Sequence, residues 1–348
     1  MRGYNISGMR FVKPDISLPM YGAVMALCCT VMATGRALPA SSTVLADSGA
    51  LGATVSTPAS REYIYPDAGP VNIMKNLPGD VAEFGRRTFC RENIPVLAGI
   101  TVSTALLIAS DSYTFEKTWE MGDRMGIAHL ERKSTIVRVH VPVLNRDVGL
   151  LALPNSLGTA MYFLGDGWMH MSITGAFFGY GYLASDIRAL KTAADLLETL
   201  TLNGTTVLAI KMSTGRENPV DRSTPTGKWR FFTNPVTYLG HVTKYDAYPS
   251  GHVASVTGTV TVIAENYPEY RWIQPVGYAM LVPLGFQMVN GGIHWYSDYP
   301  LSLFIGYTYA KIVLGRRRIV RAGETVLLPD VRPIPLAGGA GLELCWNM

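Results

Sequence analysis

The chain has 348 residues, of which 48% are hydrophobic and only 16% are charged, and its formal net charge is +4. Soluble domains average about 25% charged residues, so this composition indicates a membrane-associated protein or a deeply buried helical bundle. The small net charge, with no basic stripe carrying interleaved aromatic residues, argues against a nucleic-acid partner.

The N-terminal segment has the layout of an export signal. The basic residues Arg2, Arg10 and Lys13 precede an apolar stretch over residues 18–34, and Val44-Leu45-Ala46 fits a small-residue cleavage site. We predict a signal peptide over residues 1–46, with a retained signal anchor as the alternative. Either outcome places the protein in a bacterial cell envelope, in the inner membrane or the periplasm.

The remainder is predicted to be an all-α bundle of about six helices. Residues 47–92 are rich in Ser, Ala, Gly and Pro and are predicted to be a linker with one short helix near its end. A helical domain over residues 93–322 follows, and the tail, residues 323–348, alternates like a short β-hairpin. Apolar periodicity predicts helices over residues 94–109, 156–183, 187–212, 249–266, 272–289 and 299–314. Strand-like pieces at 135–143 separate the first two.

Two orientation signals differ. The arginines after the last helix favour an outward-facing site, whereas a cleaved signal peptide followed by three crossings would place the end of the third helix inside. The two agree if the first helix does not cross the membrane or if the whole bundle is periplasmic. Only the segment 94–109 approaches the ~20 apolar residues of an unbroken membrane span. Arg316, Arg317 and Arg318 follow the last helix, and clustered arginines of this kind favour the cytoplasmic side. The opposite ends of the helices would then face the periplasm.

Three polar clusters fall at those opposite helix ends. They contain Lys211, His252 and His294, which are separated by 41 and 42 residues. Each interval fits one loop plus one helix, so the three side chains can return to one end of the bundle. We therefore expect an active site there.

The cluster around His252 is suited to binding an anion and to proton transfer. Pro249-Ser250-Gly251 opens a helix, whose first backbone N–H groups form an anion site. Gly251 permits close approach of an oxygen, and the hydroxyl of Ser250 adds a donor. His252, in the first turn, is placed to protonate a leaving oxygen.

The other two clusters supply a nucleophile and positive charge. His294 and Asp298 are four residues apart, and a carboxylate on one imidazole nitrogen would leave the other free to attack. Lys211 and Arg216 would hold a phosphoryl group and stabilise its spread charge.

Together these clusters resemble the signatures of the type 2 phosphatidic acid phosphatase superfamily, which includes bacterial class A acid phosphatases and vanadium haloperoxidases. The family patterns are K-x6-R-P, P-S-G-H and S-R-x5-H-x3-D. The resemblance implies that His294 forms a phosphohistidine, that His252 protonates the leaving group and that Asp298 orients His294. It also implies that Lys211, Ser250 and Gly251 bind phosphate oxygens.

Two signature arginines are replaced in this chain. Asn218 occupies the first position, before Pro219, and Met288, after Gln287, occupies the second. Arg216 is the candidate substitute for one lost guanidinium, and Asn218 is a neutral candidate contact. The sequence predicts a phosphatase acting on a phosphate monoester or a lipid (pyro)phosphate. A catalytically degenerate subunit of an envelope complex is the alternative, and a haloperoxidase is a less favoured one.

No metal or cofactor is predicted. The four cysteines show no C-x-x-C or other ligand spacing, and no His, Cys or acidic cluster suggests a metal site. A disulfide between Cys90 and Cys345 would form only in an oxidising compartment. The expected partners are a phosphorylated small molecule or lipid and the membrane.

Overall fold

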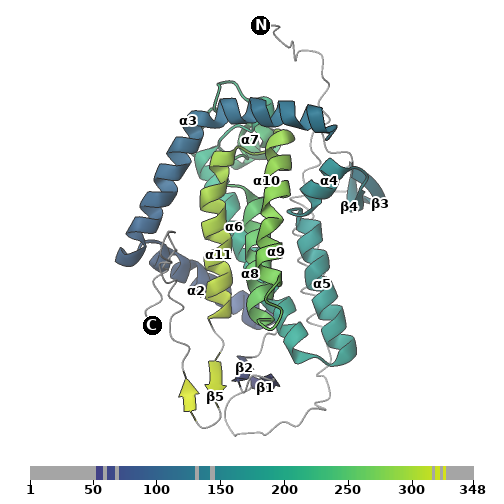
Figure 1. The fold of residues 1–348 in the computed structure, drawn as a ribbon, viewed down its shortest axis with the longest axis vertical. Coiled ribbons are helices and arrows are strands. Elements are labelled where there is room, and N and C mark those ends of the chain that lie inside the picture. Colours follow the sequence, from purple (N-terminus) through teal and green to yellow (C-terminus); the bar gives the residue numbers. More distant parts are fainter. Residues whose placement is uncertain are drawn as a thin grey trace.

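The computed structural model describes residues 52–57, 61–66, 70–129, 133–141, 146–315, 318–321 and 324–326. The predicted signal peptide and most of the predicted tail, with Cys345, lie outside these ranges. The described chain is dominated by α-helices, which confirms the predicted all-α class (Figure 1).

The N-terminal helices are longer than the sequence predicted. Helix α2 spans Pro70–Thr88, and α3 spans Ile94–Met125 after a short 3-10 turn at Arg91–Asn93. The extension of α3 beyond residue 109 has a physical cause. Its second half buries Asp111, Phe115, Thr118 and Gly122, which recur on one face at helical spacing.

Helix α3 frames the rest of the bundle. It rises along one side and then crosses one end, close to α7 and α10 (Figure 1). Within the described residues, the segment Arg91–Met125 is the one helix long and apolar enough to cross a membrane. Its most apolar window has a mean hydropathy of 1.7, and 11% of that window is buried.

The predicted helix over residues 156–183 is two helices. A hairpin of β3 (Lys133–Val141) and β4 (Arg146–Pro154) leads into α4 (Leu157–Phe163) and α5 (Gly167–Ala184). The break follows from Asp166, whose side chain accepts a hydrogen bond from the backbone of Trp168 at 2.9 Å and so caps a new helix.

The later helices match their predicted positions, with one further break. They are α6 (Ile187–Thr214), α8 (Gly251–Asn266), α9 (Ile273–Ala279), α10 (Leu281–Asn290) and α11 (Tyr299–Leu314). The short helix α7 (Pro235–Gly240) was not predicted. The predicted helix over 272–289 is divided between α9 and α10 at Met280. Pro283 lies in the first turn of α10, where its missing N–H and its ring prevent a continuous helix.

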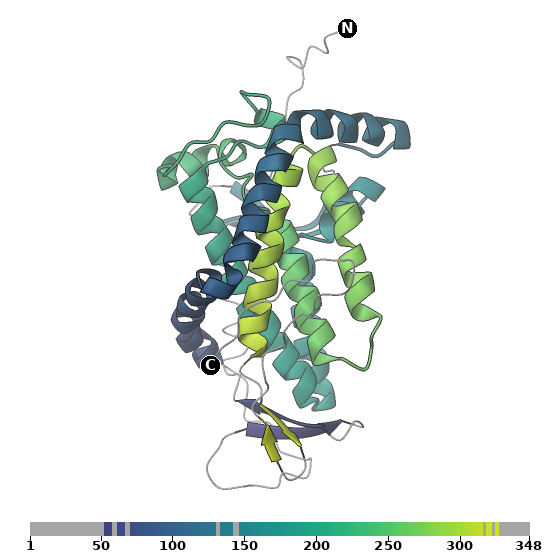
Figure 2. The same ribbon diagram turned by 60° about the vertical axis from the view of Figure 1, so that its left-hand side comes forward.

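A small sheet lies at the end of the bundle opposite α7 (Figure 2). Its strand order is β1 (Gly52–Thr57), β2 (Arg61–Pro66), β5 (Arg318–Arg321) and β6 (Glu324–Val326), with antiparallel pairing throughout. The predicted C-terminal hairpin is not confirmed, because most of residues 323–348 lie outside the described ranges.

Close packing of α6, α8 and α11 forms the centre of the bundle. Their buried apolar residues form one cluster with a contribution from α2, including Leu202, Ala254, Ile305 and Tyr309. A β-carbon built on Gly306 would lie only 2.3 Å from the backbone oxygen of Ala254. The approach of α11 to α8 therefore requires a residue without a side chain at position 306.

Replacing Gly306 by alanine should destabilise the protein by about 1–3 kcal/mol or more, because the helices must move apart. Gly204→Ala is the matched control, since a β-carbon on that exposed residue of α6 meets nothing within 4 Å. The control should leave stability unchanged or raise it by about 0.5–1 kcal/mol through helix propensity. Denaturant unfolding measures both. Equal stabilities of the two variants would contradict the packing described here.

Candidate active site

Three helix ends converge at the end of the bundle that α3 crosses. Lys211 lies in the last turn of α6, His252 lies in the first turn of α8, and His294 lies between α10 and α11. The ring centroids of His252 and His294 are 5.6 Å apart, with the rings edge to face. The structure thus brings the two predicted catalytic histidines together.

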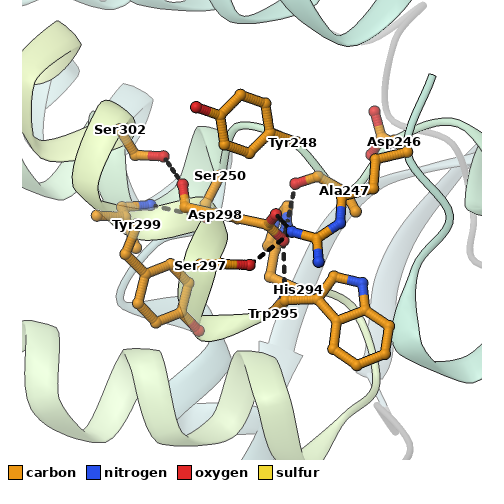
Figure 3. A network of polar contacts seen from close by, with 12 residues as sticks. Asp246, Ala247, Tyr248, Ser250, His294, Trp295, Ser297, Asp298, Tyr299 and Ser302 are labelled. Atoms are coloured by element: carbon orange, nitrogen blue, oxygen red, sulfur yellow. Dashed lines mark hydrogen bonds and ion pairs between the residues drawn. The ribbon is translucent and has the colours of Figure 1, made fainter. Parts of the chain in front are cut away.

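The imidazole of His294 is held in one tautomer. It is fully buried, and its Nδ1 lies 2.7 Å from the backbone oxygen of Ala247 (Figure 3). A carbonyl only accepts, so Nδ1 carries the proton and donates it. Nε2 is then unprotonated, and it has no hydrogen-bond partner among the described residues. Burial first, and the charge of Lys211 second, lower the pKa of His294 to about 3. The ring is therefore neutral near pH 7.

Asp298 lies farther from His294 than the Ala247 carbonyl does. One carboxylate oxygen, Oδ2, is 3.5 Å from Nδ1 of His294 and accepts a hydrogen bond from the backbone N–H of Trp295 at 2.7 Å. The other accepts from Arg216 at 2.6 Å. Burial raises the pKa of Asp298 to about 6, whereas Arg216 and the Trp295 N–H act in the opposite direction. The closest partner that orients His294 is consequently a backbone oxygen, with Asp298 second.

Arg216 does not occupy the position expected of a phosphate ligand. Its side chain is fully buried, and its guanidinium donates to Asp298 and Ser297, each at 2.6 Å. It also donates to Asp111 at 2.7 Å and to the backbone oxygen of Thr226 at 2.9 Å. The guanidinium is committed to two carboxylates, so the structure gives Arg216 a positioning role in place of the predicted substrate contact.

Asp111 is the residue of this network that the sequence analysis missed. It is buried on α3, and it accepts hydrogen bonds from Arg216 and from the hydroxyl and backbone N–H of Ser297. Asp111 is the first charged residue after the uncharged stretch 94–110 of α3, and this was the available signal, because a carboxylate beside apolar residues is costly unless it is paired.

The predicted anion site lies at the capped start of α8. The hydroxyl of Ser250 accepts from the backbone N–H of Val253 at 3.4 Å, and the N–H of Ser250 donates to the backbone oxygen of Asp298 at 3.3 Å. Gly251 is the first residue of the helix, where backbone N–H groups lack helical partners. His252, half-buried, follows with its ring 4.9 Å from that of Tyr162.

A close approach of two backbones places His252. A β-carbon on Gly165, in the turn between α4 and α5, would lie 2.7 Å from the β-carbon of His252. Only glycine allows this turn to pack so tightly against the first turn of α8.

The cationic part of the site is small. The ammonium of Lys211 lies 3.0 Å from the carboxylate of Asp246. Asn218 is buried, and its side-chain oxygen has no hydrogen-bond partner in the described part of the chain. Met288 is fully buried in an apolar cluster with Tyr162 and Leu284. No guanidinium is therefore supplied from either altered signature position.

The amides near Met288 are occupied by other contacts. The Gln287 amide donates to the backbone oxygen of Ala128 at 3.0 Å, and its oxygen accepts from Asn290 at 3.1 Å. The side-chain oxygen of Asn290 lies 2.7 Å from Nδ1 of His129. These groups join α10 to the end of α3. Among the described residues, no group of three or more His, Cys, Asp or Glu could hold a metal ion.

Comparison with known proteins agrees with this arrangement. The family model described as PAP2 superfamily matches residues 192–318, from α6 to the start of β5 and about a third of the chain. All three clusters fall within this match. No curated protein and no solved structure matches the chain. Residues 192–318 are thus similar to the PAP2 superfamily, and this match supports a phosphatase-type function in general.

Asp111→Asn should destabilise the protein by about 3–5 kcal/mol, because it leaves a buried guanidinium with one partner charge fewer. The matched control is Glu269→Gln, the same chemical change in a pair with Arg188 whose acidic side chain is 47% exposed. That change should cost less than about 1 kcal/mol. Urea unfolding of both variants tests the difference. A loss of similar size in the two would show that the buried network does not stabilise the fold.

Proposed function

We propose that the protein is a metal-free phosphatase that hydrolyses a phosphate monoester or a lipid (pyro)phosphate through a phosphohistidine on His294. The observation that supports this proposal is the tautomer of the His294 imidazole. Nδ1 of His294 donates to Ala247, while the unprotonated Nε2 is buried with no partner among the described residues, beside His252. An imidazole held in this way is an activated nucleophile.

The chemistry follows from the positions of the two histidines. As the bond between Nε2 of His294 and phosphorus forms, the bond to the leaving oxygen breaks, and His252 gives that oxygen its proton. A water molecule then attacks the phosphohistidine and transfers a proton to His252, which releases inorganic phosphate and restores Nε2. Lys211, Ser250 and the N–H groups that begin α8 would stabilise the phosphoryl oxygens.

A catalytically degenerate subunit of an envelope complex is the second candidate. Asn218 and Met288 supply no guanidinium, and Arg216 is paired with two carboxylates. Each lost charged contact would weaken transition-state binding by roughly 1.5–3 kcal/mol. The intact His294 and His252 favour the enzyme over this alternative.

We further propose that α3 attaches the protein to the bacterial inner membrane, with the site on the periplasmic side. The apolar window of α3 is only 11% buried. Among its large apolar side chains, Val102 is 58% exposed and Leu106 is 69% exposed. Contact with lipid would remove this surface from water.

The first activity experiment compares phosphate release by the native protein and by His294→Ala. We expect turnover in the native protein that a chelator does not reduce and that vanadate, a phosphoryl analogue, inhibits. His294→Ala should lower turnover by at least about 10³-fold, because the nucleophile is lost. His252→Ala should spare substrates with good leaving groups, which need no proton.

His241→Ala is the matched control for these variants, since His241 is exposed and caps the end of α7. It should retain native turnover. A chelator-sensitive activity would refute the metal-free mechanism. A native rate equal to that of His294→Ala on lipid, sugar and nucleotide phosphates would instead establish the degenerate subunit.

Membrane attachment is tested by flotation with vesicles of neutral phospholipid. The double variant Val102→Glu, Leu106→Glu should float at least about tenfold less than the native protein, because two charges would enter the apolar phase. The control is Phe232→Glu, Val236→Glu, which places the same charges on residues 83% and 79% exposed near the site. Loss of flotation only in the control would exclude α3 as the attachment.

A further inference from the structure

The cation most directly available to a bound phosphoryl group already faces a carboxylate. The ammonium of Lys211 and the carboxylate of Asp246 are 3.0 Å apart, and their side chains are 10% and 24% exposed. Asp246 comes from the loop between α7 and α8, two residues before Tyr248 and the start of the anion site. Its negative charge thus lies where a phosphate oxygen would meet Lys211.

The carboxylate is held in this position by the fold. The hydroxyl of Tyr238, a buried residue of α7, donates a hydrogen bond to the same Oδ1 atom that faces Lys211. The backbone of Asp246 also bridges to that of Arg216. Asp246 is therefore a fixed part of the site rather than a mobile surface acid.

The charge of Asp246 reaches the nucleophile. Three titratable groups from other elements face it: Lys211 of α6, Tyr238 of α7 and His294 after α10. Asp246 favours the charged form of His294 and so raises its pKa, whereas Lys211 lowers it. A negative charge close enough to act on the ring would also act on a phosphoryl group attached to it.

The other charges of the site do not compensate for Asp246. Arg216 lies between Asp111 and Asp298, so that trio carries more negative than positive charge when its carboxylates are ionised. Lys211 and Asp246 neutralise each other. A phosphate dianion would bring two further negative charges into this buried region, and like charges at short range repel strongly.

We propose that Asp246 is a specificity-determining residue that makes the site select a phosphoryl group with a single negative charge. The groups of this class are a phosphate diester and the monoanion of a phosphate monoester. This inference rests on the proposed phosphoryl site at Lys211 and His294. With a diester, the bond from Nε2 to phosphorus forms, one alcohol leaves with the proton of His252, and the second ester bond remains.

Binding of two small probes tests the selection. Methyl phosphate loses its second proton near pH 6, whereas dimethyl phosphate keeps one negative charge throughout the range. The readout is the affinity for methyl phosphate divided by the affinity for dimethyl phosphate at the same pH. For the native protein we expect this ratio to be about tenfold higher at pH 5 than at pH 8. Taking the ratio of the probes removes changes that affect every anion, such as protonation of His252.

Asp246→Asn should increase the affinity for methyl phosphate at pH 8 by about tenfold and change that for dimethyl phosphate by less than about threefold. Tyr238→Phe removes the hydrogen bond but keeps the carboxylate, so the ratio of the two affinities should stay native. Asp221→Asn is the matched control in the loop after α6, where the carboxylate accepts from Thr243. It should leave both affinities unchanged.

The outcomes separate this inference from the proposed phosphatase. A ratio that Asp246→Asn does not alter, or the binding of neither probe to the native protein, overturns the selection by Asp246. If the ratio shifts as expected but no substrate turns over, the selection stands and the phosphatase fails. Phosphate release from the monoester, or alcohol release from the diester, then identifies which singly charged substrate is hydrolysed.

Discussion

The geometry of the site depends on one buried guanidinium. Arg216 follows the end of α6, and it pairs with Asp111 of α3 and with Asp298 in the turn before α11. These elements are far apart in the sequence, and the guanidinium joins them beside the direct contact between Asp111 and Ser297. Burying such charges is costly unless every partner is present. The position of α3 and the position of the turn that carries Asp298 therefore depend on each other.

The same network determines what remains for chemistry. Because Asp298 is bound to Arg216 and to the N–H of Trp295, the Ala247 carbonyl is the closest acceptor for Nδ1 of His294. A neutral acceptor fixes the tautomer without placing a full charge at hydrogen-bond distance from the ring. The imidazole of His294 is thus neutral and oriented, while the guanidinium of Arg216 is paired with two carboxylates of the fold.

Local sequence signals were sufficient for the helix ends that carry Lys211, His252 and His294 and for the convergence of the histidines. The spacing of Lys211, His252 and His294 matches one loop and one helix per interval, and the structure brings the histidine rings to 5.6 Å. The same signals could not predict the partners of Arg216, because its pairing with Asp111 joins residues 105 positions apart. The split of the predicted helix at Asp166 could not be predicted either. An aspartate can lie within a helix or cap the start of a new one, and the sequence does not distinguish the two.

The balance of charges also explains why restoring a single arginine is a weak way to restore a typical phosphate site. An arginine at position 218 would add one positive charge, but Asp246 would still face Lys211 and compete for it. The backbone N–H groups at the start of α8 act differently, since they are neutral donors with a partial positive field. Donors of this kind gain less from a further negative charge than a full cation does, because they carry only a partial positive charge. In a site that relies on these N–H groups, with Lys211 already paired with Asp246, a second negative charge on the ligand adds little attraction. It adds repulsion from the carboxylate of Asp246.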